Sequence, residues 1–267
     1  MSSDFHCEIA NRNTLEDKTS DQPTHLAEIV RREPTHLGFC DASRLGAGVV
    51  WLDTSHLGQD LVWRHSWPAD IIADLISSVN GEGTITNSNL ELAALVLHEE
   101  TLLAAVPEAR LAAPHSVLDN NPTVSWSTKE ASTINPVVAD LLCLRALHSR
   151  QFFINPSVFY HPGIENRMAD DAYRLFELSD TSLLTHMSYV YPQSQISWTI
   201  SLPPPDLLSC VISTLRRRLC KRELHKILAS RDSTSSGATS APPSISILIS
   251  KIHPYLALRS SKSTGTG

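Results

Sequence analysis

Four acidic side chains stand where a carboxylate could serve chemistry. Asp41 interrupts an apolar run, Glu91 lies early in a long apolar helical pattern, Asp119 ends a short apolar run, and Asp170 lies near the start of a last helical pattern. A charged carboxylate in a half-buried strand is costly unless it is paired or bound to a metal. If the four converge, they need cations to stay ionised, and oxygen-only ligands suit Mg²⁺ or Mn²⁺. Two such ions would stabilise the attacking and leaving oxygens of a phosphodiester cleavage.

Each acid, taken alone, also has a local explanation. Glu91 follows Ser88 by three residues, which matches a capping box with Ser88 as the helix cap. Asp119 precedes Asn-Asn-Pro and suits a turn. Asp170 would complement a helix dipole, and Asp41 could lie on an edge strand open to water. The joint occurrence of all four in this order of elements favours the metal site.

The elements that must position these acids can be read from hydrophobic periodicity and turn residues. Their order is three strands, a helical region, strand, helix, strand, helix, which predicts an α/β fold with a mixed five-stranded sheet flanked by helices. We expect strands over 36–43, 46–52, 60–67, 115–118 and 157–161, and helices over 68–79, 88–106, 135–151 and 165–178.

Composition divides the chain into five parts. Residues 1–34 are polar without a sustained period and are expected to be a flexible lead-in, and 35–180 form the α/β domain. A proline-containing linker is expected over 181–205 and a basic helical segment over 206–231. Residues 232–267 have low complexity and predict a disordered tail.

Several classes of protein are excluded by composition. No apolar run reaches the length of a membrane span, and no secretory signal opens the chain. The five cysteines are scattered without a CxxC pair, which is typical of reduced thiols rather than a disulfide framework or a zinc site. The formal net charge of −6 argues against binding nucleic acid by charge alone. We therefore expect an intracellular protein, cytoplasmic or nuclear, with no membrane partner.

Four short segments together carry a family resemblance. They are 38–43 (GFCDAS) followed by a Gly-Ala-Gly bend, 89–94 (NLELAA), 118–123 (LDNNPT) and 161–170 (HPGIENRMAD). The string resembles the ribonuclease H domain of retrotransposon reverse transcriptases, in gypsy-like and related polyproteins. The resemblance covers about residues 35–180. It departs from the family at Tyr173, where Ser is common, and we expect that departure to be without consequence.

The resemblance implies an RNase H-like fold that cuts the RNA strand of an RNA–DNA hybrid. In that family a metal-activated water attacks the phosphate and leaves a 3′-hydroxyl and a 5′-phosphate. Carried over to this sequence, the ligands of two Mg²⁺ (or Mn²⁺) ions would be Asp41, Glu91, Asp119 and Asp170. Asp171 would replace Asp170 if the last helix were registered one residue later.

Three further polar residues lie in or near these segments. His161 occupies the loop where some relatives carry a histidine that moves protons, and a solvated loop residue is its alternative. Asn166 would hydrogen-bond Asp170 or the hybrid, or cap the last helix. His98 lies seven residues beyond Glu91 and is expected to serve packing.

Charge bears on the partners of the domain. Residues 36–180 contain eight Lys or Arg and eighteen Asp or Glu, a balance of −10 that two divalent ions bring only to about −6. We expect weak binding of hybrid, helped by a polymerase module in a parent polyprotein. The basic residues of 215–231 would contact nucleic acid or form a solvated helix face.

Two other functions compete with the ribonuclease. One is a catalytically silent, RNase H-shaped connector or transposon remnant, which the missing polymerase signature and the acidic balance favour. The other is a DNA-strand transferase on the same fold, for which a helix-borne Glu91 between two strand-borne aspartates is the wrong pattern.

Overall fold

A computed structural model describes the central part of the chain. The described residues are 35–53, 59–106, 113–130, 135–152, 154–163, 166–192 and 197–217. The predicted lead-in over 1–34, the tail over 232–267 and most of the basic segment lie outside these residues. Within them, no helix combines the length and the apolar character needed to cross a membrane.

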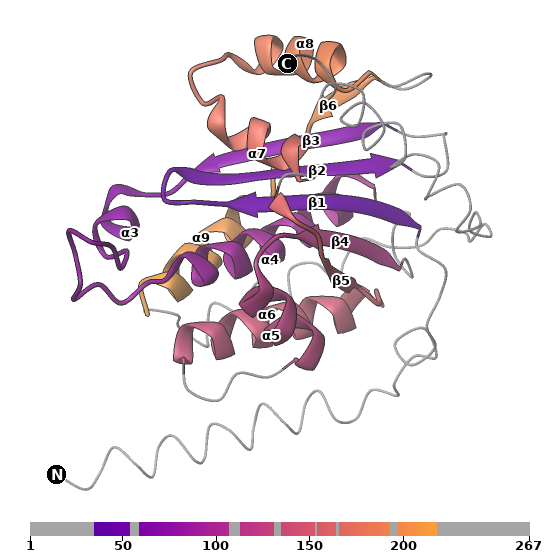
Figure 1. The fold of residues 1–267 in the computed structure, drawn as a ribbon. Coiled ribbons are helices and arrows are strands. Elements are labelled where there is room, and N and C mark those ends of the chain that lie inside the picture. Colours follow the sequence, from indigo (N-terminus) through magenta and orange to yellow (C-terminus); the bar gives the residue numbers. More distant parts are fainter. Residues whose placement is uncertain are drawn as a thin grey trace, which may run out of the picture.

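A mixed sheet of six strands forms the centre of the described structure (Figure 1). The strand order is β5-β4-β1-β2-β3-β6. β1 pairs antiparallel with β2 and β2 with β3, whereas β4, β5 and β6 join by parallel pairing. The α/β class is thus confirmed, while the predicted count of five strands is wrong. The strands are β1 (His36–Ala42), β2 (Gly46–Asp53), β3 (Asp60–Ser66), β4 (Pro114–Leu118), β5 (Ser157–Tyr160) and β6 (Trp198–Ile200).

The sixth strand comes from the segment predicted to be a linker, which corrects the domain boundary near 180. Helix α8 (Asp180–Val190) begins there, and β6 then pairs in parallel with β3. The indole Nε1 of Trp198 donates to the carbonyl of Tyr191 at 3.1 Å. The sequence did not predict this strand, because it has only three residues and lies in a proline-containing segment. Helix α9 (Pro205–Leu215), expected within a separate basic segment, buries Leu207 and Val211 in the main core.

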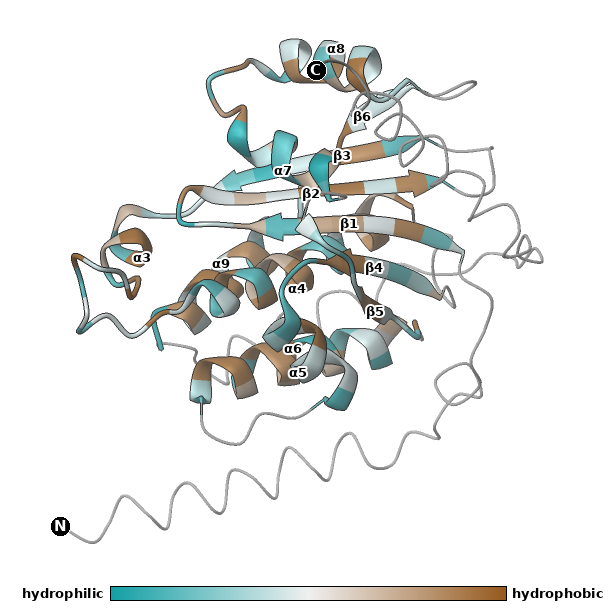
Figure 2. Cartoon of the chain, in the orientation of Figure 1, coloured by the Kyte–Doolittle hydropathy of each residue, from teal (hydrophilic) through white to brown (hydrophobic). Residues whose placement is uncertain are grey.

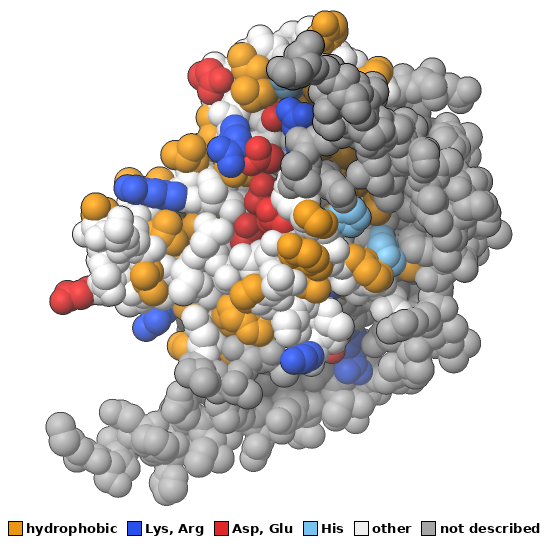
Figure 3. All heavy atoms as spheres, in the orientation of Figure 1, with side chains coloured by type: hydrophobic (Ala, Val, Ile, Leu, Met, Phe, Trp, Pro, Cys, Tyr) orange, Lys and Arg blue, Asp and Glu red, His pale blue; other side chains and the backbone are white. Residues whose placement is uncertain are grey.

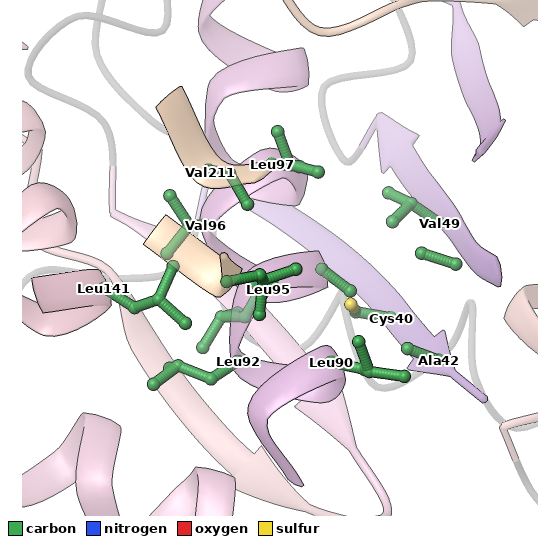
Figure 4. Packing of buried hydrophobic residues seen from close by; sticks show 14 of the residues in the cluster. Cys40, Ala42, Val49, Leu90, Leu92, Leu95, Val96, Leu97, Leu141 and Val211 are labelled. Carbon is green, nitrogen blue, oxygen red and sulfur yellow. The ribbon is translucent and has the colours of Figure 1, made fainter. Parts of the chain in front are cut away.

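Helices cover both faces of the sheet, and the sheet separates two hydrophobic clusters. α4 (Asn87–Ala105) packs on one face, and α6 (Pro136–Phe152) and α9 pack against α4. Figure 4 shows side chains of α4 between those of β1 and those of α6 and α9. The other face packs against α7 (Arg167–Arg174) and α8. Figure 2 shows α9 as mostly apolar and α7 as largely polar, because α7 turns only one narrow side to the sheet.

Two helices differ from the expectation. The helix expected over 68–79 is limited to α3 (Ala69–Ala73), because the chain then forms isolated bridges between Leu75 and Ile85 and between Ser77 and Asn80. A short helix, α5 (Asn121–Lys129), follows β4 where only a turn was expected. Asn120 caps α5, and its side-chain oxygen accepts the N–H of Thr123 at 3.0 Å.

Candidate metal centre

Three of the four predicted acids meet at one end of the sheet. Asp41 lies on β1, Glu91 on α4, and Asp119 directly after β4. Each offers a carboxylate oxygen, and these oxygens lie within 4.8 Å of one another. β1 and β4 are parallel neighbours, so residues near their C-terminal ends share one edge. Figure 3 shows acidic side chains gathered near the middle of one face, where β1 ends in Figure 1.

The start of α4 fixes the position of Glu91. The hydroxyl of Thr86 accepts the N–H of Asn89 at 3.2 Å, while Asn89 Oδ1 accepts the N–H of Thr86 at 2.9 Å. This reciprocal pair is a capping box two residues earlier than expected. Ser88 is therefore not the helix cap. Glu91 therefore does not take part in the capping box, and its side chain is almost fully buried beside the other two acids.

Asp119 is held between the end of β4 and the loop that follows β5. The N–H of His161 donates to the carbonyl of Leu118 at 2.8 Å, which brings this loop beside the acid. A Cβ added at Gly163 would overlap Asp119 Oδ2, so the glycine allows the loop to lie directly against the carboxylate. The Pro-Gly pair of the sequence thus has a structural role at the site.

Of the two alternatives on α7, Asp170 is the acid near the triad. Its charge raises the pKa of both Asp41 and Asp119, and its carboxylate pairs with Arg174. Asp171 faces α8, where it accepts the hydroxyl of Tyr191 at 2.7 Å. Among the described residues, Asp170 is not one of the acids whose oxygens lie within 4.8 Å of each other.

Burial without a cation dominates the electrostatics of the triad. Burial, then the charges of Asp119 and Asp170, raise the pKa of Asp41 to about 7. Burial, then Asp41 and Asp119, also raise the pKa of Glu91 well above its usual range, and burial raises that of Asp119. No Lys, Arg or His in the described part of the chain forms an ion pair with any of the three.

The donor set fits a hard divalent cation. Three carboxylates converge, and the buried Oε2 of Glu91 has no hydrogen-bond partner among the described residues. An unpartnered buried carboxylate oxygen is costly, and a bound cation would remove that cost. Oxygen-only ligands favour Mg²⁺ or Mn²⁺ over zinc. The triad of Asp41, Glu91 and Asp119 could therefore hold a metal ion.

Comparison with family models, curated proteins and solved structures found no match for this chain. The inference about the chemistry of the site therefore rests on its residues and their geometry.

The contact of α7 with the sheet brings Asp170 to the site. A Cβ on Gly48 of β2 would overlap the carbonyl oxygen of Ala169 and lie 2.7 Å from the backbone nitrogen of Tyr173. The start of α7 is tied to β1, because Asn166 Nδ2 donates to the carbonyl of Cys40 at 2.8 Å. Asn166 therefore neither caps α7 through its side chain nor donates to Asp170, and instead fixes the helix to the strand.

The two histidines singled out by sequence have different surroundings. His161 is half-buried beside Asp119, in the loop that Gly163 completes. His98 is fully buried and stacks on Trp51 with ring centroids 3.9 Å apart, and neither ring nitrogen has a hydrogen-bond partner among the described residues. His98 thus serves packing, as expected.

Sequence reasoning underestimated Tyr173. This residue is buried, and burial, then the charge of Asp41, raises the pKa of its hydroxyl, whereas the neighbouring Ser43 side chain after β1 lowers it. Its departure from the family pattern was visible in the sequence. Its contact with Ser43 was not, because that contact depends on how closely α7 approaches the first two strands.

Proposed function

We propose that this chain is a metal-dependent endoribonuclease of the RNase H type, which hydrolyses the RNA strand of RNA–DNA hybrids as a part of a retroelement polyprotein. The observation that carries the proposal is the convergence of Asp41, Glu91 and Asp119, which form no ion pair with a Lys, Arg or His among the described residues. These acids come from three of the four segments that resemble the family. The proposed activity acts inside the cell, where such hybrids form.

The residues of the site have distinct tasks in this proposal. Asp41, Glu91 and Asp119 would hold one divalent ion, and Asp170 would complete the binding of a second. Bound ions would activate the attacking water and stabilise the leaving oxygen. His161, beside Asp119 in the loop, would exchange protons with the leaving group. Gly163 leaves the carboxylate of Asp119 open to this loop.

Affinity for the hybrid is expected to depend on a second module. The balance of −10 over residues 36–180 repels phosphates, even after two divalent ions bind. Binding by the isolated chain should be weak and should fall steeply with salt. A polymerase module in the parent polyprotein would supply the missing contacts.

Cleavage of a labelled hybrid by the full chain in Mg²⁺ tests the proposal. Only the RNA strand should be cut, and Asp119→Asn should lower the rate by about a thousandfold or more, because a metal ligand is lost. Asp171→Asn is the matched control, since Asp171 faces Tyr191 rather than the triad, and it should keep the rate within about threefold.

The alternatives predict different results. Cleavage of the DNA strand would favour the strand transferase. A folded chain whose thermal midpoint rises with Mn²⁺ but which cuts no hybrid at any Mg²⁺ concentration would favour the silent connector. Cleavage that persists in Asp119→Asn would contradict the assigned site.

A further inference from the structure

Asp170 differs from the triad because the protein supplies its cation. Arg174 lies one helical turn along α7 and forms an ion pair with the Asp170 carboxylate. The side chain of Asp170 is 29% exposed and that of Arg174 is 61% exposed. The pair therefore lies at the rim of the site, with the arginine on the side of the solvent.

Tyr173 lies beside this pair. Its backbone nitrogen lies against Gly48 of β2, and its side chain is buried near Ser43 and Asp170. The guanidinium carbon of Arg174 lies 5.4 Å from the centre of the Tyr173 ring, within the range of a cation–π contact. Asp170 thus lies between the buried side chain of Tyr173 and an exposed cation, Arg174, on the solvent side.

The carboxylate of Asp170 is close enough to act on the triad. Its negative charge raises the pKa of Asp41 and of Asp119. The bond to Asp170 raises the pKa of the Arg174 guanidinium, and the charge of Asp41 adds a smaller contribution. A cation that entered the site would therefore compete with Arg174 for the same carboxylate.

We propose that Arg174 is a positioning residue, an internal counter-ion that holds the Asp170 carboxylate until a divalent ion displaces it. The inference rests on the metal site of the proposed function. Arg174 stays protonated in the exchange, since guanidinium does not titrate in proteins. Because the Arg174 side chain is already mostly exposed, it can turn into water at little cost.

Mn²⁺ titration of the full chain, followed by electron paramagnetic resonance, tests the exchange without requiring activity. In Arg174→Met the more weakly bound of the two Mn²⁺ ions should bind about threefold to fivefold tighter. This factor corresponds to the free energy of a partly exposed ion pair. Arg174→Lys keeps the charge and should stay close to the unchanged chain. Arg167→Met is the matched control, because it removes the same charge from the same helix at a position whose field acts on Tyr191.

Each outcome decides the proposal. Equal tightening in Arg167→Met would reduce the effect to net charge and overturn it. Weaker Mn²⁺ binding by Arg174→Met would show that the arginine prepares the ligand for metal, which also overturns it. Absence of Mn²⁺ binding by all folded variants overturns the exchange together with the site. Tighter binding by Arg174→Met, in a chain that cuts no hybrid, would support the exchange and contradict the nuclease.

Discussion

Helix α4 carries buried acids near both ends, and the two ends treat them differently. Near its C-terminus, Glu99 accepts three hydrogen bonds from the guanidinium of Arg145 on α6, at 2.8 to 3.0 Å. Glu100 pairs with His148, which also lies on α6. Near its N-terminus, Glu91 meets two further acids and no cation among the described residues.

The difference lies in the source of the cation. Burial raises the pKa of Glu99 as it raises that of Glu91, but the charge of Arg145 opposes the shift only at Glu99. The C-terminal acids are compensated within the protein and join α4 to α6. Within the described residues no cation faces the acids at the N-terminal end, so their burial carries a cost that a bound metal ion would reduce.

Removing the internal cation should produce the largest loss of stability. In Arg145→Met, Glu99 is left buried and unpaired, which should lower the free energy of unfolding by about 3–5 kcal/mol. Urea denaturation measures the change. The double variant Glu99→Leu with Arg145→Met removes both charges and should recover most of the loss. A double variant as unstable as the single one would show that packing, rather than charge, decides this end of the helix.

Removing a charge from the triad should have the opposite sign and should depend on pH. The folded protein keeps a proton on Asp41 up to about pH 7, whereas the unfolded chain releases it near pH 4. The contribution of Asp41 to stability therefore falls as pH rises from about 4 to 7. The measurement is urea denaturation in EDTA, which removes metal. The free energy of unfolding of Asp41→Asn, relative to that of the unchanged chain, should increase by about 2–4 kcal/mol as pH rises from 4 to 7.5.

The comparison between the two chains is needed because buried histidines act in the other direction. Burial lowers the pKa of His115 to about 4 and that of His98 well below its usual range, so the contribution of His115 to stability grows as pH rises from about 4 to 6.5, and that of His98 also grows below pH 6.5. Their effect is the same in both chains and cancels in the difference. A difference that does not change with pH would mean that the triad is compensated by groups other than metal.

Moving one carboxylate without changing any charge gives a smaller effect. In Gly163→Ala the new methyl group would displace Asp119 Oδ2, which should slow cleavage by about tenfold while the free energy of unfolding changes by less than about 1 kcal/mol. Gly81→Ala is the matched control, because nothing lies within 4 Å of a Cβ there. Equal rates for the two variants would show that the loop does not position Asp119.

Much of the site could be predicted because its residues violate local expectations. Asp41 lies in an apolar strand and Asp119 at the end of another, and a charge at such positions requires a tertiary explanation. The parallel pairing of β1 with β4 then brings the two acids together, and the five expected strands all form. Short motifs therefore sufficed for three converging acids and for most of the sheet.

The remaining features depend on contacts between distant elements. β6 has only three residues, which is too short for a hydrophobic period to be recognised. Its pairing partner, β3, lies far away in the sequence. The i,i+4 spacing of Asp170 and Arg174 was visible, but the position of the Arg174 guanidinium 5.4 Å from the centre of the Tyr173 ring was not. The sequence analysis expected Ser88 to cap α4, whereas the observed cap is Thr86, two residues earlier, with similar local chemistry.

The choice between these caps leads to the smallest predicted effect. Thr86→Ala removes the acceptor for the N–H of Asn89 and should lower the free energy of unfolding by about 1 kcal/mol. Ser88→Ala should change it by less than about 0.5 kcal/mol, because the hydroxyl of Ser88 caps nothing. Since the first turn of α4 also holds Glu91, Thr86→Ala should weaken Mn²⁺ binding slightly, whereas the Arg145 pair at the other end should be unaffected. Equal losses in the two alanine variants would return the cap to Ser88 and make Glu91 a capping residue, which would remove it from the triad.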